Sequence, residues 1–314
     1  MQLVTYQYAE DVRLGALSEG LLVDLQCAQQ AWVEEVREAG EDRVGNVQIP
    51  DNMMALLDGG QDILEQAQKT IFWVREGFAT NPQSPGMVAC SYPLEDVSLL
   101  PPVPAPGKII CVGMNYPSPG TSNPPPKYPV LFLKATSTLT GHKGAIQLPR
   151  ASRDVFCEGE LAVVIGRRGR HIPRERALSY VAGYTIANDV GARDLEARSS
   201  QWATGKLPDT FSPMGPALVT RDEVPDPTVL SIKTYVNEQL VQDGSTGDMI
   251  FDVPYLVSYL SGITTLEPGD IILTGSPKAV GERPAPKVRL RPGDTIKIEI
   301  EGLGVLTNTT VAEE

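Results

Sequence analysis

The spacing of apolar and polar residues predicts a small mixed unit at the start of the chain. Residues 1–15 and 20–25 form short alternating runs around a Ser-Glu-Gly turn, which predicts two strands of a hairpin. Residues 24–38 then repeat apolar positions at helical spacing, with Asp24 as the expected N-cap. Residues 51–77 continue the helical pattern and are interrupted by a pair of glycines, so one or two helices are expected there.

A proline-rich segment separates this unit from a part with a different pattern. Residues 101–107 (PPVPAPG) predict a stiff, extended connection. From Lys108 onward, short apolar or alternating runs are bounded by Gly, Pro and Asp, as is typical of strands, and helices are expected over 191–203 and 252–261. The fold class is therefore α+β, with a small N-terminal α/β domain at 1–100 and a strand-rich domain at 101–314.

Charge and cysteine usage narrow the choice of partners. The formal net charge of −12 repels phosphate backbones and anionic lipid, so neither nucleic acid nor a membrane is expected as a partner. The opening segment differs from a signal peptide, and no apolar run approaches the ~18 residues of a spanning helix. Cys27, Cys90, Cys111 and Cys157 show no CxxC spacing, which predicts free thiols and a location in the reducing cytoplasm.

Three acidic residues carry the candidate chemistry. Residues 156–166 (FCEGELAVVIG) predict a buried strand on which Glu158 and Glu160 project to the same side. Asp189 ends a second apolar strand and precedes a helix. Such acids repel each other and lose hydration, which a hard cation such as Mg²⁺ or Mn²⁺ would relieve. Each motif alone is commonly a solvated strand face or a helix cap, so it is their combination that predicts a metal site.

A series of ordered motifs extends over about residues 108–310. These motifs are G-x-N-Y (113–116), F-x-K (132–134), E-G-E-L-A-V-V-I-G (158–166), G-Y-T-I-x-N-D-x-x-A-R-D (183–194), G-K-x-x-D-T-F-x-P-x-G-P (205–216) and L-x-P-G-D-I-I-x-T-G-x-P (266–277). Together they resemble the motifs of the fumarylacetoacetate hydrolase superfamily, and the N-terminal region is similar to the small extra domain of its oxaloacetate-decarboxylating members. The resemblance implies a β-rich, rolled mixed sandwich, a homodimer, and a Mg²⁺ or Mn²⁺ site at Glu158, Glu160 and Asp189.

The same resemblance implies further site residues. Arg193 and Lys206 match cationic positions that line the site, although Arg193 can equally serve as an ion-pair partner of Asp189. For Lys134 a structural role stays open, and Glu196 either adds negative charge near the site or faces solvent. The expected substrate-binding set is Asn115, Tyr116, Lys134 and the loop residues Thr274, Gly275 and Ser276.

The implied substrate is a small anionic carbonyl compound. A 2-oxo acid chelates a cation through its carboxylate and keto oxygens, and the metal then stabilises an enolate. The resemblance therefore implies decarboxylation, tautomerisation or hydrolysis of a 2-oxo acid or β-dicarbonyl acid. Our main hypothesis is a metal-dependent lyase or tautomerase that acts on a 2-oxo diacid such as oxaloacetate.

One expected feature is missing from the sequence. Relatives follow G-x-N-Y with a His–Glu pair that activates a water, whereas residues 117–126 contain neither residue and are rich in proline. This loss favours enolate chemistry over hydrolysis. Two alternatives stay open: a C–C hydrolase of acylpyruvate-like or fumarylacetoacetate-like compounds with His142 as its base, and a non-catalytic relic that binds ligand.

Overall fold

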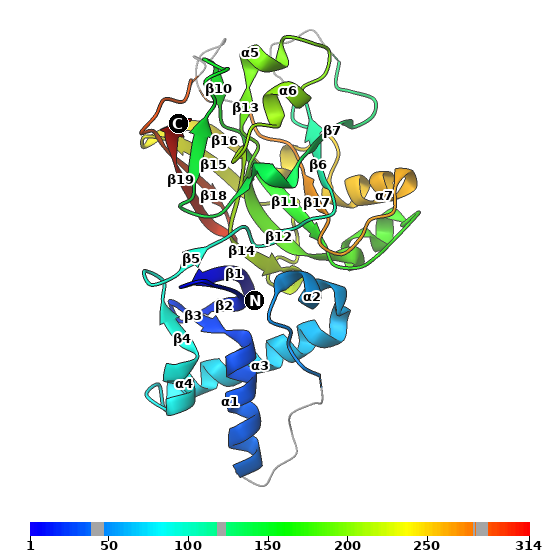
Figure 1. The fold of residues 1–314 in the computed structure, drawn as a ribbon. Coiled ribbons are helices and arrows are strands. Elements are labelled where there is room, and N and C mark those ends of the chain that lie inside the picture. Colours follow the sequence, from blue (N-terminus) through cyan, green and yellow to red (C-terminus); the bar gives the residue numbers. More distant parts are fainter. Residues whose placement is uncertain (39–46, 118–123, 279, 281–287) are drawn as a thin grey trace.

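In the computed structural model, which describes residues 1–38, 47–117, 124–278, 280 and 288–314, strands from the N-terminal and central parts of the chain join one large sheet (Figure 1). The strands of this sheet are β1 (Gln2–Tyr8), β2 (Asp11–Ser18), β3 (Leu21–Asp24), β4 (Ser91–Pro93), β5 (Ser98–Leu99), β6 (Ile109–Gly113), β7 (Val130–Lys134), β8 (Leu139–Thr140), β11 (Gly159–Ile165), β12 (Val181–Asn188), β14 (Ser212–Thr220) and β17 (Ile271–Leu273). They run in the order β4-β3-β2-β1-β14-β12-β11-β17-β6-β7, with β5 on β1 and β8 on β14.

A second sheet packs against the middle of the first. Its order is β16-β15-β18-β19-β9, and a separate two-stranded ribbon pairs β10 with β13. These strands are β9 (Ala145–Leu148), β10 (Val155–Phe156), β13 (Gly191–Ala192), β15 (Ser231–Val236), β16 (Gln239–Ser245), β18 (Thr295–Ile300) and β19 (Gly304–Ala312). The β-rich sandwich of the predicted fold class is confirmed.

Strand β11 explains how the layers meet. Its side chains alternate, so Leu161 and Val163 belong to the core shared with the second sheet, whereas Ala162 and Val164 face the core shared with the N-terminal helices. At Gly159 a Cβ atom would lie 2.2 Å from Thr234 Oγ1 of β15. Glycine is therefore required at the point where the two sheets approach most closely.

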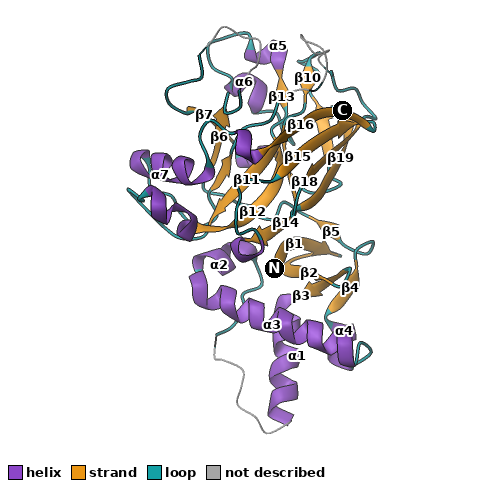
Figure 2. Cartoon of the chain, turned by 180° about the vertical axis from the view of Figure 1, so that it is seen from behind, coloured by secondary structure: helices purple, strands orange, loops and turns teal. Residues whose placement is uncertain are grey.

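Most of the predicted helices are confirmed. Asp24 caps α1 (Leu25–Glu38) by accepting the Cys27 N–H at 2.7 Å, and the glycine pair separates α2 (Met53–Asp58) from α3 (Gly60–Thr80). The remaining α-helices are α4 (Pro85–Ala89), α5 (Arg193–Glu196), α6 (Ala203–Lys206) and α7 (Val253–Ile263), and the 3₁₀ helices are η1 (Thr136–Thr138), η2 (Arg174–Tyr180), η3 (Arg221–Glu223) and η4 (Thr246–Asp248). Figure 2 shows α1 to α4 gathered at one end of the molecule and α5 and α6 at the other.

The predicted helix over 191–203 is wrong. The segment instead forms β13, the single turn of α5 and a bend that leads to α6. The hydroxyl of Ser199 donates to the carbonyl of Gln201 and accepts the Gln201 N–H. Local hydrogen bonds of this kind compete with the helical ladder, which the apolar spacing alone does not reveal.

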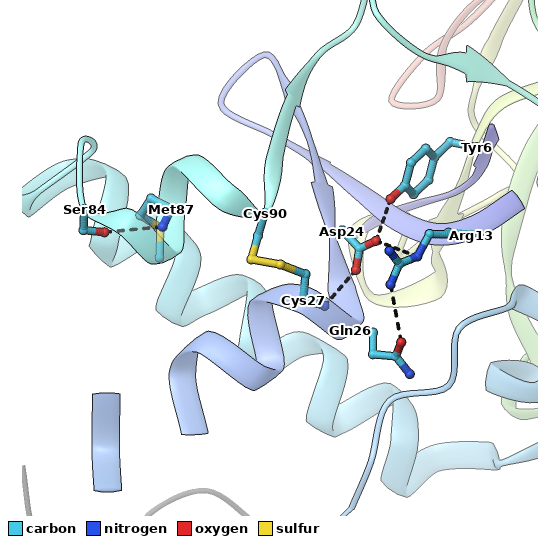
Figure 3. Close-up of a disulfide and its surroundings, with 8 residues drawn as sticks. All are labelled: Tyr6, Arg13, Asp24, Gln26, Cys27, Ser84, Met87 and Cys90. Carbon is cyan, nitrogen blue, oxygen red and sulfur yellow. Dashed lines mark hydrogen bonds and ion pairs between the residues drawn. A yellow bond between two sulfur atoms is a disulfide. The ribbon is translucent and has the colours of Figure 1, made fainter. Parts of the chain in front are cut away.

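The prediction of four free thiols is wrong for two of them. Cys27 on α1 and Cys90 at the end of α4 form a disulfide with their Cα atoms 5.4 Å apart (Figure 3). They are 63 positions apart in sequence, so their spacing gives no hint of the pairing. Cys111 and Cys157 are free thiols, as predicted. No helix among the described residues is long and apolar enough to span a membrane.

Candidate active site

The structure brings the three predicted acids together. Glu160 lies on β11, Glu158 directly precedes it, and Asp189 directly follows β12, which pairs with β11 through Gly159 and Asn188. One carboxylate oxygen from each acid lies within 4.8 Å of the others. Glu160 and Asp189 are almost fully buried, and Glu158 is half-buried. The strand pairing therefore places three carboxylates at one end of the large sheet.

Two buried lysines hold this cluster. Lys206 Nζ donates to Glu158 Oε2 at 2.9 Å, to Asp189 Oδ2 at 2.8 Å and to the Asp189 carbonyl at 3.1 Å. Lys134 Nζ donates to Asp189 Oδ1 at 2.6 Å. Burial alone would raise the pKa of Asp189, but the two ammonium groups outweigh it and hold this pKa below its usual value. Asp189 is therefore ionised at neutral pH.

The pKa of Glu160 is shifted in the opposite direction from that of Asp189. Burial, followed by the charges of Asp189 and Glu158, raises the pKa of Glu160 well above its usual value. The N–H of Gly275 donates to Glu160 Oε2 at 2.7 Å and offsets only part of this cost. A divalent cation between the carboxylates would remove the repulsion. The donor set fits such an ion, because carboxylate oxygens are the ligands that hard divalent cations prefer.

The acid cluster opens into a cavity of about 220 Å³. Lys206 and Arg193 supply positive charge to its wall, and Phe132 and Trp202 supply an aromatic side. These aromatic rings meet edge to face with centroids 5.6 Å apart. The full lining consists of Val112, Gly113, Met114, Asn115, Tyr116, Phe132, Phe156, Glu158, Glu160, Asp189, Arg193, Glu196, Trp202, Lys206, Gly275, Ser276 and Lys278.

A second cavity of about 250 Å³ lies next to the first. The two cavities share Phe156, Glu158, Arg193, Ser276 and Lys278 in their linings. Because Arg193 belongs to both walls, a ligand in either cavity can reach its guanidinium group. The combined space is large enough for a small diacid beside a metal ion.

Several predicted substrate-binding residues form hydrogen bonds with backbone groups around the site. The Asn115 amide donates to the carbonyls of Phe251 and Thr274 at 3.0 and 2.7 Å, and its oxygen accepts the Phe251 N–H. The Thr274 hydroxyl donates to the Leu161 carbonyl at 2.9 Å. These bonds fix the loop that carries Gly275 against β11. Ser276 lines both cavities.

Tyr116 follows Asn115 and is 4% exposed. Its hydroxyl has no hydrogen-bond partner among the described residues, although the ring lines the cavity. Burial, followed by the charge of Glu160, raises the pKa of Tyr116, so its hydroxyl keeps its proton. Tyr116 is therefore a hydrogen-bond donor available to a ligand.

The structure favours the structural role that the sequence left open for Lys134. Its ammonium group is buried and donates to Asp189 Oδ1 and to the carbonyls of Val190 and Phe211 at 3.1 and 2.7 Å. These three bonds use all three hydrogens of the ammonium group. Lys134 therefore supports Asp189 from behind and has no hydrogen left for a substrate.

The structure also places His142 away from the acids. This residue lies between β8 and β9, and its Nδ1 accepts the Thr307 N–H at 3.3 Å. His142 is outside the described lining of both cavities. The chain turns toward the second sheet after the F-x-K strand, so this geometry gives no support to His142 as a base.

Glu196, whose position the sequence left open, lies in the cavity wall. Its Oε1 is 4.0 Å from Lys206 Nζ and is buried without a hydrogen-bond partner among the described residues. Burial raises the pKa of Glu196, and the positive charge of Lys206 opposes this shift. The motif that ends in Arg193 and Asp194 already indicated that this segment lies near the site, because the same short helix carries Arg193 and Glu196.

Trp202 and Gln242 were not found from the sequence. A Cβ atom at Gly113 would lie 2.4 Å from the Trp202 ring, so this glycine makes room for the indole. Gln242 on β16 accepts the Gly159 N–H at 2.9 Å and donates to the Pro277 carbonyl at 2.8 Å. The side-chain amide of Gln242 therefore links β11 to the loop that carries Gly275 and Pro277. The local sequence pattern does not predict such a contact.

The chain resembles known proteins along most of its length. The profile described as fumarylacetoacetate (FAA) hydrolase C-terminal matches residues 108–311. Oxaloacetate tautomerase FAHD2A, mitochondrial, of Homo sapiens is 44% identical over 252 residues, which is 79% of this chain and 78% of that protein. Oxaloacetate tautomerase FAHD2B, mitochondrial, of Bos taurus is 44% identical over 254 residues, covering 80% and 79%.

Solved structures show the same similarity. The 5-carboxymethyl-2-hydroxymuconate delta-isomerase of Mycobacterium smegmatis superposes with a TM-score of 0.71 and 32% identity, and both chains are covered fully. Maleylpyruvate hydrolase of Sphingobium sp. SYK-6, solved with manganese(II) and pyruvate, gives a TM-score of 0.72 and 30% identity, again over the whole of both chains.

The comparison overturns one prediction and supports another. The predicted cytoplasmic location is wrong on this comparison, because the curated relatives at 44% identity are mitochondrial proteins by name. The predicted divalent-metal site gains support, because a structural relative was solved with manganese(II) and this chain gathers three acids in its cavity.

Proposed function

The chain belongs to the fumarylacetoacetate hydrolase family and is an enzyme of that family, and we propose that it catalyses keto–enol exchange of a small 2-oxo diacid with Mg²⁺ or Mn²⁺ bound. One observation carries the proposal: three acids and a buried lysine meet in one cavity that also presents Arg193. Oxaloacetate is the first substrate to test, because curated relatives are oxaloacetate tautomerases. Decarboxylation of the same substrate would break a C–C bond in place of a C–H bond and release CO₂, with the electron pair again moving toward the carbonyl oxygen.

Glu158, Glu160 and Asp189 would hold the metal. With Lys134 and Lys206 these acids carry a net charge of −1, and a divalent cation changes this to +1. The metal changes the site from one that repels an anion to one that attracts it. A bound Mg²⁺ or Mn²⁺ supplies Lewis-acid polarisation of a carbonyl oxygen.

Arg193 is the proposed anchor for a substrate carboxylate. Its guanidinium carbon lies 4.0 Å from the centre of the Phe156 ring, and its Nε has no hydrogen-bond partner among the described residues. A guanidinium group can donate two parallel hydrogen bonds to a carboxylate. Arg193 would therefore fix one end of a diacid while the other end lies near the metal ligands.

Lys206 would stabilise the charge that forms during the reaction. The surrounding acids, Asp189 first, outweigh the effect of burial and raise the pKa of Lys206, so this residue stays cationic. The aromatic rings of Phe132 and Phe156 lie 5.5 and 5.0 Å from its ammonium nitrogen. They exclude water from this side, which strengthens the electrostatic effect of the ammonium group on a developing oxyanion.

The proposal is tested by following oxaloacetate with and without metal. Purified protein with Mn²⁺ or Mg²⁺ should accelerate the change in enol absorbance above the buffer rate, and a chelator should abolish the acceleration. Glu160→Gln should remove it as well, whereas Glu175→Gln on the exposed η2 helix should not. If the rate with protein is no higher than the rate with metal and substrate alone, the proposal is contradicted.

The same assay separates the alternative functions. Pyruvate formation in proportion to substrate loss would identify decarboxylation as the main reaction. Release of two carboxylic acids from an acylpyruvate would favour a C–C hydrolase, the class of the Sphingobium relative. Metal binding by calorimetry without turnover of any of these compounds would favour a ligand-binding relic.

Two predictions about organisation stay predictions. A boundary near residue 100 fits the start of the family match at residue 108, although β1 pairs with β14 within the large sheet. The homodimer would use an exposed apolar surface, and edge strand β7 offers one, since Leu131 and Leu133 are 37% and 60% exposed. Light scattering on the purified protein measures the assembly directly.

A further inference from the structure

Glu196 occupies a space that the fold provides for it. It is the last residue of α5, and glycines lie on both sides of its side chain. A Cβ atom at Gly191 would lie 2.6 Å from Glu196 Oε1, and a Cβ atom at Gly205 would lie 2.4 Å from Glu196 Cγ. The same Cβ atoms would also lie 2.5 Å from the Phe156 ring and 2.5 Å from the Ala192 carbonyl, so both glycines let the chain pack closely around Glu196 in the cavity wall.

The Glu196 carboxylate is close to positive charge but is not saturated by it. Lys206 Nζ is 4.0 Å from Glu196 Oε1, and its three hydrogens are already donated to Glu158 and Asp189. The Glu196 side chain is 13% exposed, and Oε1 has no hydrogen-bond partner among the described residues. A buried oxygen without a partner costs about 1–3 kcal/mol, which is recovered if a ligand supplies the partner.

The other ionisable groups of the cavity are less suited to removing a proton. Glu158, Glu160 and Asp189 form the proposed metal site. Lys206, Arg193 and Lys278 carry cationic side chains, and the Tyr116 hydroxyl keeps its proton. Glu196 is the remaining carboxylate in the described lining. Keto–enol exchange needs such a group, because a C–H proton must leave the carbon next to the carbonyl.

We propose that Glu196 is the acid–base residue of this site, moving a proton to and from the carbon next to the keto group of a 2-oxo diacid. The inference rests on the proposed function. In the forward direction a Glu196 oxygen takes the proton, the C–H electron pair becomes the C=C bond, and the carbonyl π pair moves to oxygen. Water supplies the proton for that oxygen and receives the proton of Glu196, so one proton leaves carbon and one arrives at oxygen.

The decisive variant is Glu196→Gln, which keeps the shape of the side chain and removes its basicity. Solvent deuterium incorporation at the methylene carbon of oxaloacetate, followed by NMR with the buffer rate subtracted, should fall at least ~100-fold, since acid–base groups contribute about 10²–10⁴-fold. Mn²⁺ affinity by calorimetry and KM should stay within about 2-fold. Glu196→Asp, which keeps a shortened carboxylate, should retain a measurable part of the exchange.

A matched control comes from the same helix. Asp194 accepts hydrogen bonds from the Ser152 hydroxyl and the Arg153 N–H and lies outside the described lining of the cavity. Asp194→Asn should therefore exchange deuterium at the wild-type rate. If Glu196→Gln exchanges as fast as wild type, or loses Mn²⁺ binding together with exchange, the inference is overturned. A wild-type protein that binds Mn²⁺ but gives no exchange overturns the proposed function itself.

Discussion

Two of the regions in which the protein buries ionisable groups stabilise them in different ways. In the N-terminal region Asp24 is fully buried, accepts the Tyr6 hydroxyl at 2.6 Å, pairs with Arg13 Nε at 3.0 Å and caps α1 (Figure 3). Its charge is balanced by one cation, and its oxygens are occupied by donors. In the cavity Glu158, Glu160 and Asp189 outnumber the two lysines beside them.

The contrast separates stability from function. A satisfied buried network such as that of Asp24 fixes the structure and needs no ligand. The cavity gathers more acids than lysines and the pKa of Glu160 is raised, so a bound cation would complete its electrostatics. Changes in the first region should therefore lower the free energy of unfolding, and changes in the second should lower activity and metal binding.

The largest effect is expected for Asp189→Asn. The substitution removes a proposed metal ligand and the charge that Lys134 and Lys206 share. Turnover should fall at least ~1000-fold, which corresponds to about 4 kcal/mol in activation free energy. Steady-state kinetics and Mn²⁺ calorimetry measure the two losses. Retention of tight metal binding would show that the acid cluster is not the metal site.

Asp24→Ala should have the next largest effect, on stability alone. It leaves Arg13 and the Tyr6 hydroxyl without their partner and removes the cap of α1. Arg13 is 35% exposed, so the loss comes mainly from the helix cap, about 0.5–2 kcal/mol, and from the unpaired Tyr6 hydroxyl, about 1–3 kcal/mol; chemical denaturation measures their sum. Activity per folded molecule should be unchanged. A matching loss of turnover in fully folded protein would contradict the separation of the two regions.

Removal of the disulfide should have a slightly smaller effect. The double variant Cys27→Ser and Cys90→Ser releases a cross-link between positions 63 apart and should destabilise the protein by about 2–4 kcal/mol. Thermal unfolding with and without reductant provides the measurement: wild type should shift on reduction, and the double variant should not. Equal melting temperatures for oxidised and reduced wild type would argue against the cross-link.

The smallest effect concerns His142 and pH. Burial, followed by the charge of Lys143, lowers the pKa of His142. The unfolded chain therefore binds a proton at higher pH than the folded one, so stability falls as pH drops below the usual histidine range of about 6.5. The loss should disappear in His142→Asn, which keeps an acceptor for the Thr307 N–H. An unchanged pH dependence in that variant would exclude His142 as its source.

The pattern of apolar and polar residues correctly predicted the features that depend on residues close together in the sequence. The alternation in FCEGELAVVIG placed Glu158 and Glu160 on one side, and strand pairing with β12 brings Asp189 to them. Asp24 and the glycine pair at the α2–α3 junction were likewise identified as helix boundaries, because caps and breakers act on their neighbours.

The remaining features depend on contacts through space. Cys27 and Cys90 meet only because α1 and α4 pack together. The ammonium group of Lys134 donates to two backbone carbonyls, one just after Asp189 and one just before β14, which its own sequence position does not reveal. The side chain of Glu196 lies between Gly191 and Gly205, which the turn of the chain brings to either side of it. None of these contacts has a periodic signature, so residue type and spacing could not reveal them.

The hydrogen bond from the Gly275 N–H to Glu160 has a consequence for protein synthesis. A nascent chain exposes the three acids long before the ribosome has made the loop at Gly275 or the strands of the second sheet that follow it. Partial chains therefore lack the pieces that bury and orient the carboxylates. Tight metal binding by these acids should therefore require the segment that carries Gly275 to be synthesised and folded onto β11.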